Sequence, residues 1–112
     1  MKLVIDECLP KRLLQIFRKH EAWTVPQIGL AGASDRELLD ELDDKEINVF
    51  ITIDGNIEYQ QEFSNRSFGT IIIRSVTNRL ESLLLLENEL LEAVGKITAG
   101  NVMHIPSNQK NN

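Results

Sequence analysis

The stretch Val49-Phe50-Ile51-Thr52-Ile53-Asp54-Gly55-Asn56 decides the fold. It is a short run of β-branched and aromatic residues that ends on a carboxylate and a turn signal, which is typical of a buried strand. The N-terminus repeats this arrangement, because Leu3-Val4-Ile5 runs directly into Asp6-Glu7. Open α/β sheets bind their ligands at the carboxyl ends of their strands. Two buried strands that both end in acids therefore predict a single site for a hard cation.

The composition limits the class of protein. A chain of 112 residues with 42% hydrophobic and 26% charged residues is typical of one globular domain. The single cysteine, Cys8, excludes an internal disulfide and favours a reducing compartment. We expect a cytoplasmic protein, because no segment approaches the roughly 20 apolar residues of a membrane span and no signal-peptide pattern opens the chain. The net charge of −5 argues against a generic nucleic-acid coat, but a metal ion at the site would reverse the local charge.

Strands and helices alternate along the sequence. We expect strands over residues 1–6, 23–25, 48–53, 70–74 and 102–105. We expect helices that begin at Leu9-Pro10, over residues 34–46, over residues 57–63 and over residues 80–97. This alternation predicts a three-layer α/β/α domain over residues 1–106, with a mostly parallel sheet of four or five strands. Asp6 and Asp54 meet only if the strand order is near 2-1-3-4-5. Residues 107–112 are expected to be a disordered tail.

Two segments match the capping box, in which a polar N-cap residue and a glutamate three positions later satisfy each other's backbone N–H groups. Ser34-Asp35-Arg36-Glu37 opens the second predicted helix, and Asn78 to Glu81 opens the last one. Seven of the seventeen acidic residues lie between Asp35 and Glu46. We expect most of these seven to form a solvated helix face.

The acids that end the first and third predicted strands are the candidate metal ligands. Mg²⁺ and Mn²⁺ prefer oxygen ligands, and Mg²⁺ commonly takes one or two carboxylates, the number that Asp6 and Asp54 supply. Glu7 points away from Asp6 if the strand persists, but it can turn inward at a strand end. The alternative is that these acids only cap neighbouring helix N-termini, where the helix dipole favours anions. Because both acids directly follow buried runs, we favour a site.

Further residues are weaker candidates for this site. The capping box already explains Glu37, and Asp35 is ordinary in a first helical turn, yet this helix begins at the same edge of the sheet. Thr52 faces the same way as Asp54 and either binds a ligand or packs. Asn56 either offers an amide oxygen to the site or belongs to an ordinary turn.

Three cations are candidates for phosphate binding. Arg74 ends the fourth strand and meets either a phosphate or a site acid, and Lys11 and Arg12 begin the first helix. His20, His104 and Cys8 show no metal-ligand spacing and are expected to be structural.

The ordered set of motifs resembles a known family. It comprises Ile5-Asp6-Glu7-Cys8-Leu9-Pro10, Gly29-Leu30-Ala31-Gly32-Ala33-Ser34-Asp35, Phe50-Ile51-Thr52-Ile53-Asp54, Asn56-Ile57-Glu58-Tyr59-Gln60-Gln61 and Asn78-Arg79-Leu80-Glu81. Across residues 1–105 the chain resembles the DUF5615 group of compact PIN-like proteins, which are relatives of VapC-type toxin ribonucleases.

The resemblance implies a metal-dependent ribonuclease that binds Mg²⁺ or Mn²⁺ through a small set of acids. Asp6 matches the acid of the first strand, Asp54 the acid of the Thr-x-Asp motif, and Asp35 the acid of the Gly-Ala-Ser-Asp segment. Asn56 stands where many members carry a further acid, so the site of this chain has one negative charge fewer than theirs. The resemblance also implies an RNA substrate and an antitoxin partner that covers the site. A homodimer is permitted by the apolar last helix.

Two other functions are compatible with the same residues. A phosphoacceptor receiver domain also places an acid pair after its first strand and an Asp after its third, but it needs a Lys that closes the last strand. Here that place reads His104-Ile105-Pro106. The other alternative is a catalytically weak PIN-like module that works by binding proteins.

Overall fold

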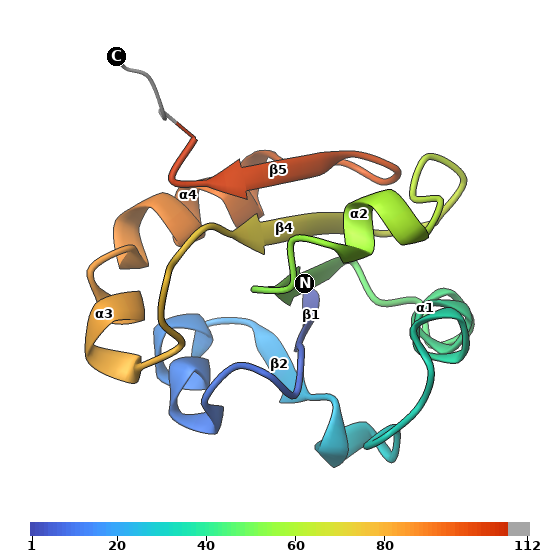
Figure 1. Ribbon diagram of the computed structural model, residues 1–112, viewed down its shortest axis with the longest axis horizontal. Helices are drawn as coiled ribbons and strands as arrows, with labels where there is room; N and C mark the ends of the chain where they lie inside the picture. Colours follow the sequence, from blue (N-terminus) through green and yellow to red (C-terminus); the bar gives the residue numbers. More distant parts are fainter. Residues whose placement is uncertain (108–112) are drawn as a thin grey trace.

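The computed structural model describes residues 1–107 and contains one five-stranded parallel sheet with the order β2-β1-β3-β4-β5 (Figure 1). The strands are β1 (Lys2–Ile5), β2 (Glu21–Thr24), β3 (Val49–Thr52), β4 (Gly69–Ile73) and β5 (Val102–Ile105). The helices are η1 (Lys11–Phe17), η2 (Pro26–Ile28), α1 (Asp35–Asp44), α2 (Ile57–Gln60), α3 (Leu80–Leu84) and α4 (Glu87–Lys96). The predicted fold class and strand order are therefore confirmed. Residues 108–112 of the predicted tail lie outside the described residues.

Alternate residues of each central strand build the two layers of the core. Leu3, Ile5, Val49 and Ile51 pack against η1, α3 and α4 on one face. Val4 and Phe50 pack on the other face, where α1 and α2 lie (Figure 1). Because the side-chain period of a strand is two, this alternation also fixes the register of the sheet, in which Ile5 is paired with Ile51.

The helix α1 begins as the sequence predicts. Ser34 Oγ accepts a hydrogen bond from Glu37 N–H, and Glu37 Oε1 accepts one from Ser34 N–H, so the capping box is complete. The predicted solvated acidic face is only partly right. Arg66 donates to Asp40 and Asp43 over 2.7 and 2.8 Å, so these two acids anchor the loop before β4 to α1.

The first predicted helix is a 3-10 helix, η1, and not an α-helix. Its N-cap residue, Pro10, has no capping side chain, and no acid lies in its first turn. Lys11 and Arg12 stand there instead and oppose the helix dipole. The stretch nevertheless buries Leu13 and Phe17, so tertiary packing maintains it.

The long helix expected over residues 80–97 is wrong, because the chain forms the two helices α3 and α4. Four consecutive leucines, residues 83–86, fit any helical phase, so the pattern carried no signal of a break. With the break, Leu83 and Leu90 are both fully buried, whereas Leu85 is 85% exposed. The second capping box is also wrong, since Arg79 is the N-cap residue of α3 and Asn78 instead donates to the Cys8 carbonyl.

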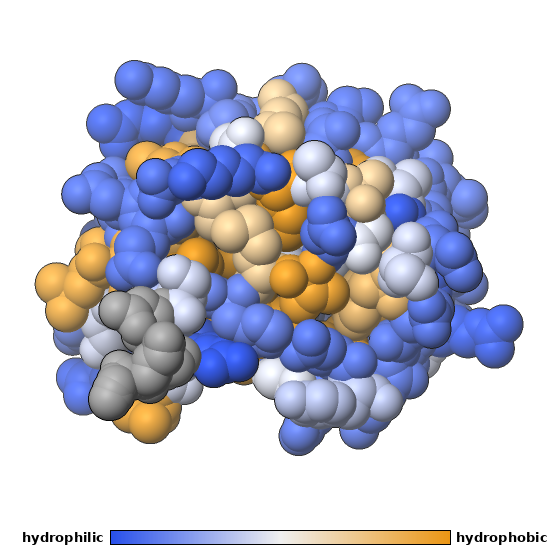
Figure 2. All heavy atoms as spheres, turned by 90° about the horizontal axis from the view of Figure 1, so that it is seen from above, coloured by the Kyte–Doolittle hydropathy of each residue, from blue (hydrophilic) through white to orange (hydrophobic). Residues whose placement is uncertain are grey.

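Within residues 1–107, no helix is long and apolar enough to cross a membrane. Figure 2 shows the face of the molecule on which β5 lies, where apolar atoms occupy the middle and hydrophilic side chains surround them. The edge strand β5 contributes the half-buried Val102 and Met103.

Candidate metal centre

Thr52 connects the two predicted metal ligands. It is the last residue of β3 and is fully buried. Its hydroxyl donates to Asp6 Oδ2 over 2.7 Å and accepts a hydrogen bond from Asp54 N–H over 3.1 Å. This contact exists because β1 and β3 are parallel neighbours, and Asp6 N–H continues their ladder by donating to the Ile51 carbonyl. The sheet thus brings together two acids that are 48 positions apart in the sequence.

Each of these two carboxylates is also fixed by its own turn. Asp6 Oδ1 accepts a hydrogen bond from Glu7 N–H over 2.8 Å, and Asp54 Oδ1 accepts one from Asn56 N–H over 3.0 Å. Within residues 1–107, Asp54 Oδ2 accepts no hydrogen bond. Both side chains are half-buried at the carboxyl edge of the sheet, where a ligand can reach them.

Asp35 is electrostatically coupled to this pair. It lies in the first turn of α1, and its pKa is raised, first by desolvation and then by the negative charges of Asp54 and Asp6. Because the charges of Asp54 and Asp6 help to raise the pKa of Asp35, a cation bound near these acids would relieve that repulsion.

The donors fit Mg²⁺ or Mn²⁺ in kind, because all of them are carboxylate oxygens. Their arrangement in space fits a metal ion less well. Within the described residues, no three His, Cys, Asp or Glu side chains are close enough together to hold a metal ion. Asp6 and Asp54 alone still meet the usual need of Mg²⁺, which binds one or two carboxylates and retains several waters. The residues therefore fit a hydrated cation and do not form a closed cage.

Glu7 and Glu37 both have partners elsewhere. The two carboxylate oxygens of Glu7 accept hydrogen bonds from Gly32 N–H over 3.4 and 3.3 Å, which ties the loop before α1 to the end of β1. Glu37 belongs to the capping box, and its pKa is lowered by the backbone hydrogen bond from Ser34. Neither carboxylate lies in the Asp6–Thr52–Asp54 network.

Cys8 is a neighbour of this network that the sequence reasoning did not identify. Its Sγ lies 3.7 Å from Thr52 Oγ1, and burial is the largest cause of the raised pKa of the thiol. A thiol with a raised pKa is neutral near pH 7 and is a poor nucleophile. The expectation that Cys8 is structural thus agrees with its surroundings.

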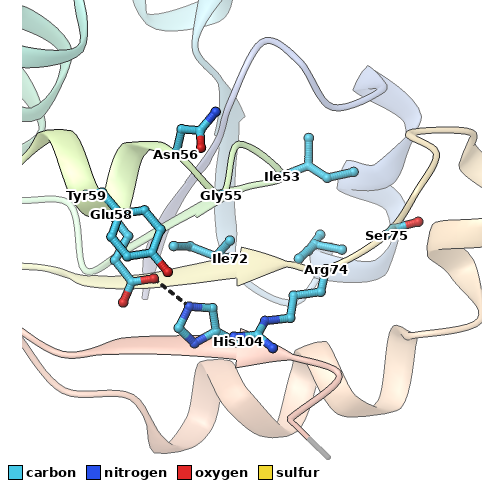
Figure 3. Close-up of a pocket in the computed structure, with 10 residues that line it drawn as sticks. Ile53, Gly55, Asn56, Glu58, Tyr59, Ile72, Arg74, Ser75 and His104 are labelled. Carbon is cyan, nitrogen blue, oxygen red and sulfur yellow. Dashed lines mark hydrogen bonds and ion pairs between the residues drawn. The ribbon is translucent and has the colours of Figure 1, made fainter. Parts of the chain in front are cut away.

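A pocket of about 360 Å³ adjoins the Asp54 turn. Asn56 and Arg74, two of the predicted site residues, line it (Figure 3). Glu58 and His104 lie in the same pocket, with Glu58 Oε1 and His104 Nε2 at a hydrogen-bonding distance of 2.7 Å. Sequence reasoning missed this pair, because residues 46 positions apart in α2 and β5 give no local signal.

The other predicted phosphate-binding cations lie elsewhere. Lys11 and Arg12 are exposed at the start of η1, and Lys11 lines a second hollow of about 410 Å³ together with Glu7. Within residues 1–107, neither of these cations nor Arg74 forms an ion pair. All three are therefore free to meet an anionic ligand.

Comparison with known proteins supports one family. A family model described as a PIN like domain matches residues 1–73, which include the whole Asp6–Thr52–Asp54 network and Asp35. No curated protein and no solved structure matches the chain significantly.

Proposed function

The chain belongs to the PIN-like domain family, and from this premise we propose that it is a metal-dependent ribonuclease that hydrolyses RNA phosphodiester bonds. PIN-like domains are often nucleases, and the site described above has the oxygen donors that such chemistry needs. The observation that carries the proposal is the hydrogen-bond link from Asp6 through Thr52 to Asp54. The negative charges of Asp6 and Asp54 also raise the pKa of Asp35.

In the proposed mechanism, Asp6 and Asp54 would hold one Mg²⁺ or Mn²⁺, and Asp35 would add a third negative charge beside them. The bound ion would polarise a phosphoryl oxygen and lower the pKa of a bound water. Thr52 fixes the orientation of the Asp6 carboxylate through its hydroxyl. Glu7 would instead anchor the loop before α1, because its carboxylate accepts hydrogen bonds from Gly32 N–H.

The exposed cations of the chain have a separate task in this proposal. Arg74, Lys11 and Arg12 would contact phosphates of the substrate backbone, and such contacts position an RNA without reading its sequence. A chain with a net charge of −5 needs local positive charge to approach an anionic polymer. We also propose that the protein is the toxin of a toxin–antitoxin pair, in which the antitoxin covers the carboxyl edge of the sheet.

The first experiment incubates the purified protein with a mixed set of structured RNAs in Mn²⁺, beside samples with EDTA and with the Asp6→Asn variant. Cleavage that is lost in both controls supports the nuclease. Asp44→Asn is the matched control, because Asp44 is an exposed acid at the end of α1 and should leave cleavage unchanged.

A second candidate function is a PIN-like module that binds proteins and cleaves RNA weakly or not at all. The absence of a three-ligand cluster within residues 1–107 favours it. This module should show little or no cleavage and no binding of Mn²⁺, and Asp6→Asn should leave its cellular effect unchanged. The receiver-domain alternative has no comparable support, because the matching family model is PIN-like and no Lys closes β5.

A further inference from the structure

The pocket between α2 and the ends of β4 and β5 is lined by both apolar and polar residues. Its inner wall is apolar and includes Ile53, Ile72 and Ile73. Its polar groups come from different elements, with Glu58 on α2, Arg74 after β4 and His104 on β5 (Figure 3). A volume of about 360 Å³ lies within the usual range of small-molecule sites.

Tyr59 is the aromatic residue of this pocket. Its side chain is 85% exposed at the rim, and it makes no hydrogen bond or ring contact with any part of the chain that the structure describes. A single exposed aromatic residue is common on protein surfaces. Here, however, it lines the same pocket as the apolar Ile72 and the unpaired Arg74 (Figure 3). Unpaired RNA bases are bound by stacking on such rings.

The polar groups are already arranged for a ligand. Glu58 Oε1 and His104 Nε2 lie 2.7 Å apart, so each holds the other in place before anything binds, which lowers the entropic cost of binding. Within the described residues, Glu58 Oε2 accepts no hydrogen bond, so it is available to an amino or imino group of a base. Arg74 supplies the positive charge that a phosphate requires.

The pocket and the candidate metal centre share one turn. Gly55 and Asn56 line the pocket, and Asn56 N–H donates to the Asp54 carboxylate over 3.0 Å. A nucleotide seated in the pocket would therefore lie next to the turn that carries Asp54.

We propose that this pocket binds one unstacked nucleotide of a single-stranded RNA segment, with its base against Tyr59, its polar edge towards Glu58 and a phosphate at Arg74. The inference rests on the proposed ribonuclease function and names the part of the substrate that the pocket recognises. It also explains why Arg74 stands apart from Lys11 and Arg12, which lie on η1.

The test measures binding without catalysis. The ¹⁵N-labelled protein is titrated in EDTA with AMP, with UMP and with ribose 5-phosphate, which lacks a base, and the amide resonances are followed by NMR. The nucleotides should shift the amides of Gly55, Tyr59 and Ser75 and bind more tightly than ribose 5-phosphate. Tyr59→Ala should weaken nucleotide binding roughly 5- to 100-fold, which corresponds to the loss of one stacked base.

Two further substitutions test the contact with the base and the contact with the phosphate. Tyr59→Phe should retain nucleotide binding, because the ring remains. Arg74→Gln should weaken binding of the nucleotides and of ribose 5-phosphate alike. Arg79→Gln is its control, since Arg79 is an exposed arginine that pairs with Glu81 outside the pocket, and it should change neither.

The outcomes distinguish this inference from the ribonuclease proposal. Cleavage of RNA together with no amide shifts in the pocket, or with unchanged binding by Tyr59→Ala, overturns the nucleotide site and leaves the nuclease standing. Nucleotide shifts in the pocket that persist in Asp6→Asn support the site even if no RNA is cleaved. Shifts confined to η1 overturn it, because the phosphate would then bind at Lys11 and Arg12.

Discussion

The hydroxyl of Thr52 donates to Asp6 Oδ2 over 2.7 Å in a fully buried position, so a neutral side chain of β3 holds the acid that follows β1. The same oxygen accepts a hydrogen bond from Asp54 N–H. Thr52 therefore orients the Asp6 carboxylate and fixes the backbone at Asp54, and it need not contact the metal itself.

Thr52→Val should weaken both stability and the site. It removes a hydrogen bond to a charged group, so urea unfolding should show a loss of about 1.5–3 kcal/mol, the usual contribution of such a bond. If the ribonuclease proposal holds, cleavage should fall at least about tenfold, because the Asp6 carboxylate is no longer held in one orientation. Circular dichroism in a urea titration and initial cleavage rates measure the two effects.

Thr70→Val is the matched control. Thr70 is fully buried on β4, and its Oγ1 has no hydrogen-bond partner in the described part of the chain. Replacing this hydroxyl by a methyl group should be neutral or stabilising, since a buried polar atom without a partner is costly. Equal losses of stability in Thr52→Val and Thr70→Val would show that the Thr52 hydrogen bond has no special role.

Divalent ions should raise the melting temperature of the protein. At ten times the dissociation constant, a bound ion adds about 1.4 kcal/mol to the free energy of unfolding, which is a shift of a few degrees. Part of the gain comes from the relief of repulsion among Asp35, Asp54 and Asp6. Differential scanning fluorimetry with Mn²⁺ and with Mg²⁺ measures the shift, and Asp54→Asn should reduce it.

Asp44→Asn should leave the metal-dependent shift unchanged, because Asp44 is exposed at the far end of α1. The absence of any shift with millimolar Mn²⁺ in the unmodified protein would count against a preformed metal site.

The central strands and their ends were predictable because their signals are local. Each of Leu3-Val4-Ile5 and Val49-Phe50-Ile51 is a continuous apolar run, as expected for strands covered on both faces, and the acids behind them mark the strand ends. The capping box at Ser34 was predictable for the same reason, since both partners lie within one turn. These features need only neighbouring residues.

The features that were missed depend on packing or on distant partners. Thr52 was predicted to face the same way as Asp54. The sequence does not show that its hydroxyl donates to Asp6 on the neighbouring strand. The pair of Glu58 and His104 joins a short helix to an edge strand. The break between α3 and α4 lets Leu83 and Leu90 both pack in the core, and no Pro or Gly marks it in the sequence.

Glu7→Gln should show whether Glu7 binds the metal or only anchors a loop. Because Glu7 accepts hydrogen bonds from Gly32 N–H, we expect it to hold the loop before α1. A glutamine retains an acceptor at this place, so the metal-dependent shift should be nearly that of the unmodified protein. The cost in stability should stay below about 1 kcal/mol, since the side chain is exposed. A shift reduced as much as in Asp54→Asn would instead assign Glu7 to the metal.

Stability in acid should depend on the contact between Asp43 and Arg66, which ties α1 and its Asp35 to the loop before β4. Burial acts to raise the pKa of Asp43, but hydrogen bonds from Arg66 and Ser67 outweigh it, so the pKa lies below the ordinary value of 3.8. The unfolded chain therefore takes up its proton first as the pH falls. The stability that the contact provides is complete above about pH 4 and is lost as the pH drops through the lower pKa of the folded state.

Asp43→Asn should accordingly cost about 1–2 kcal/mol at pH 7 and progressively less below pH 3.8, measured by urea unfolding across that range. Asp44→Asn, one position further along the same helix and exposed, should show no such dependence. A penalty for Asp43→Asn that is the same at pH 7 and at pH 3 would mean that the charge of Asp43 does not stabilise this contact.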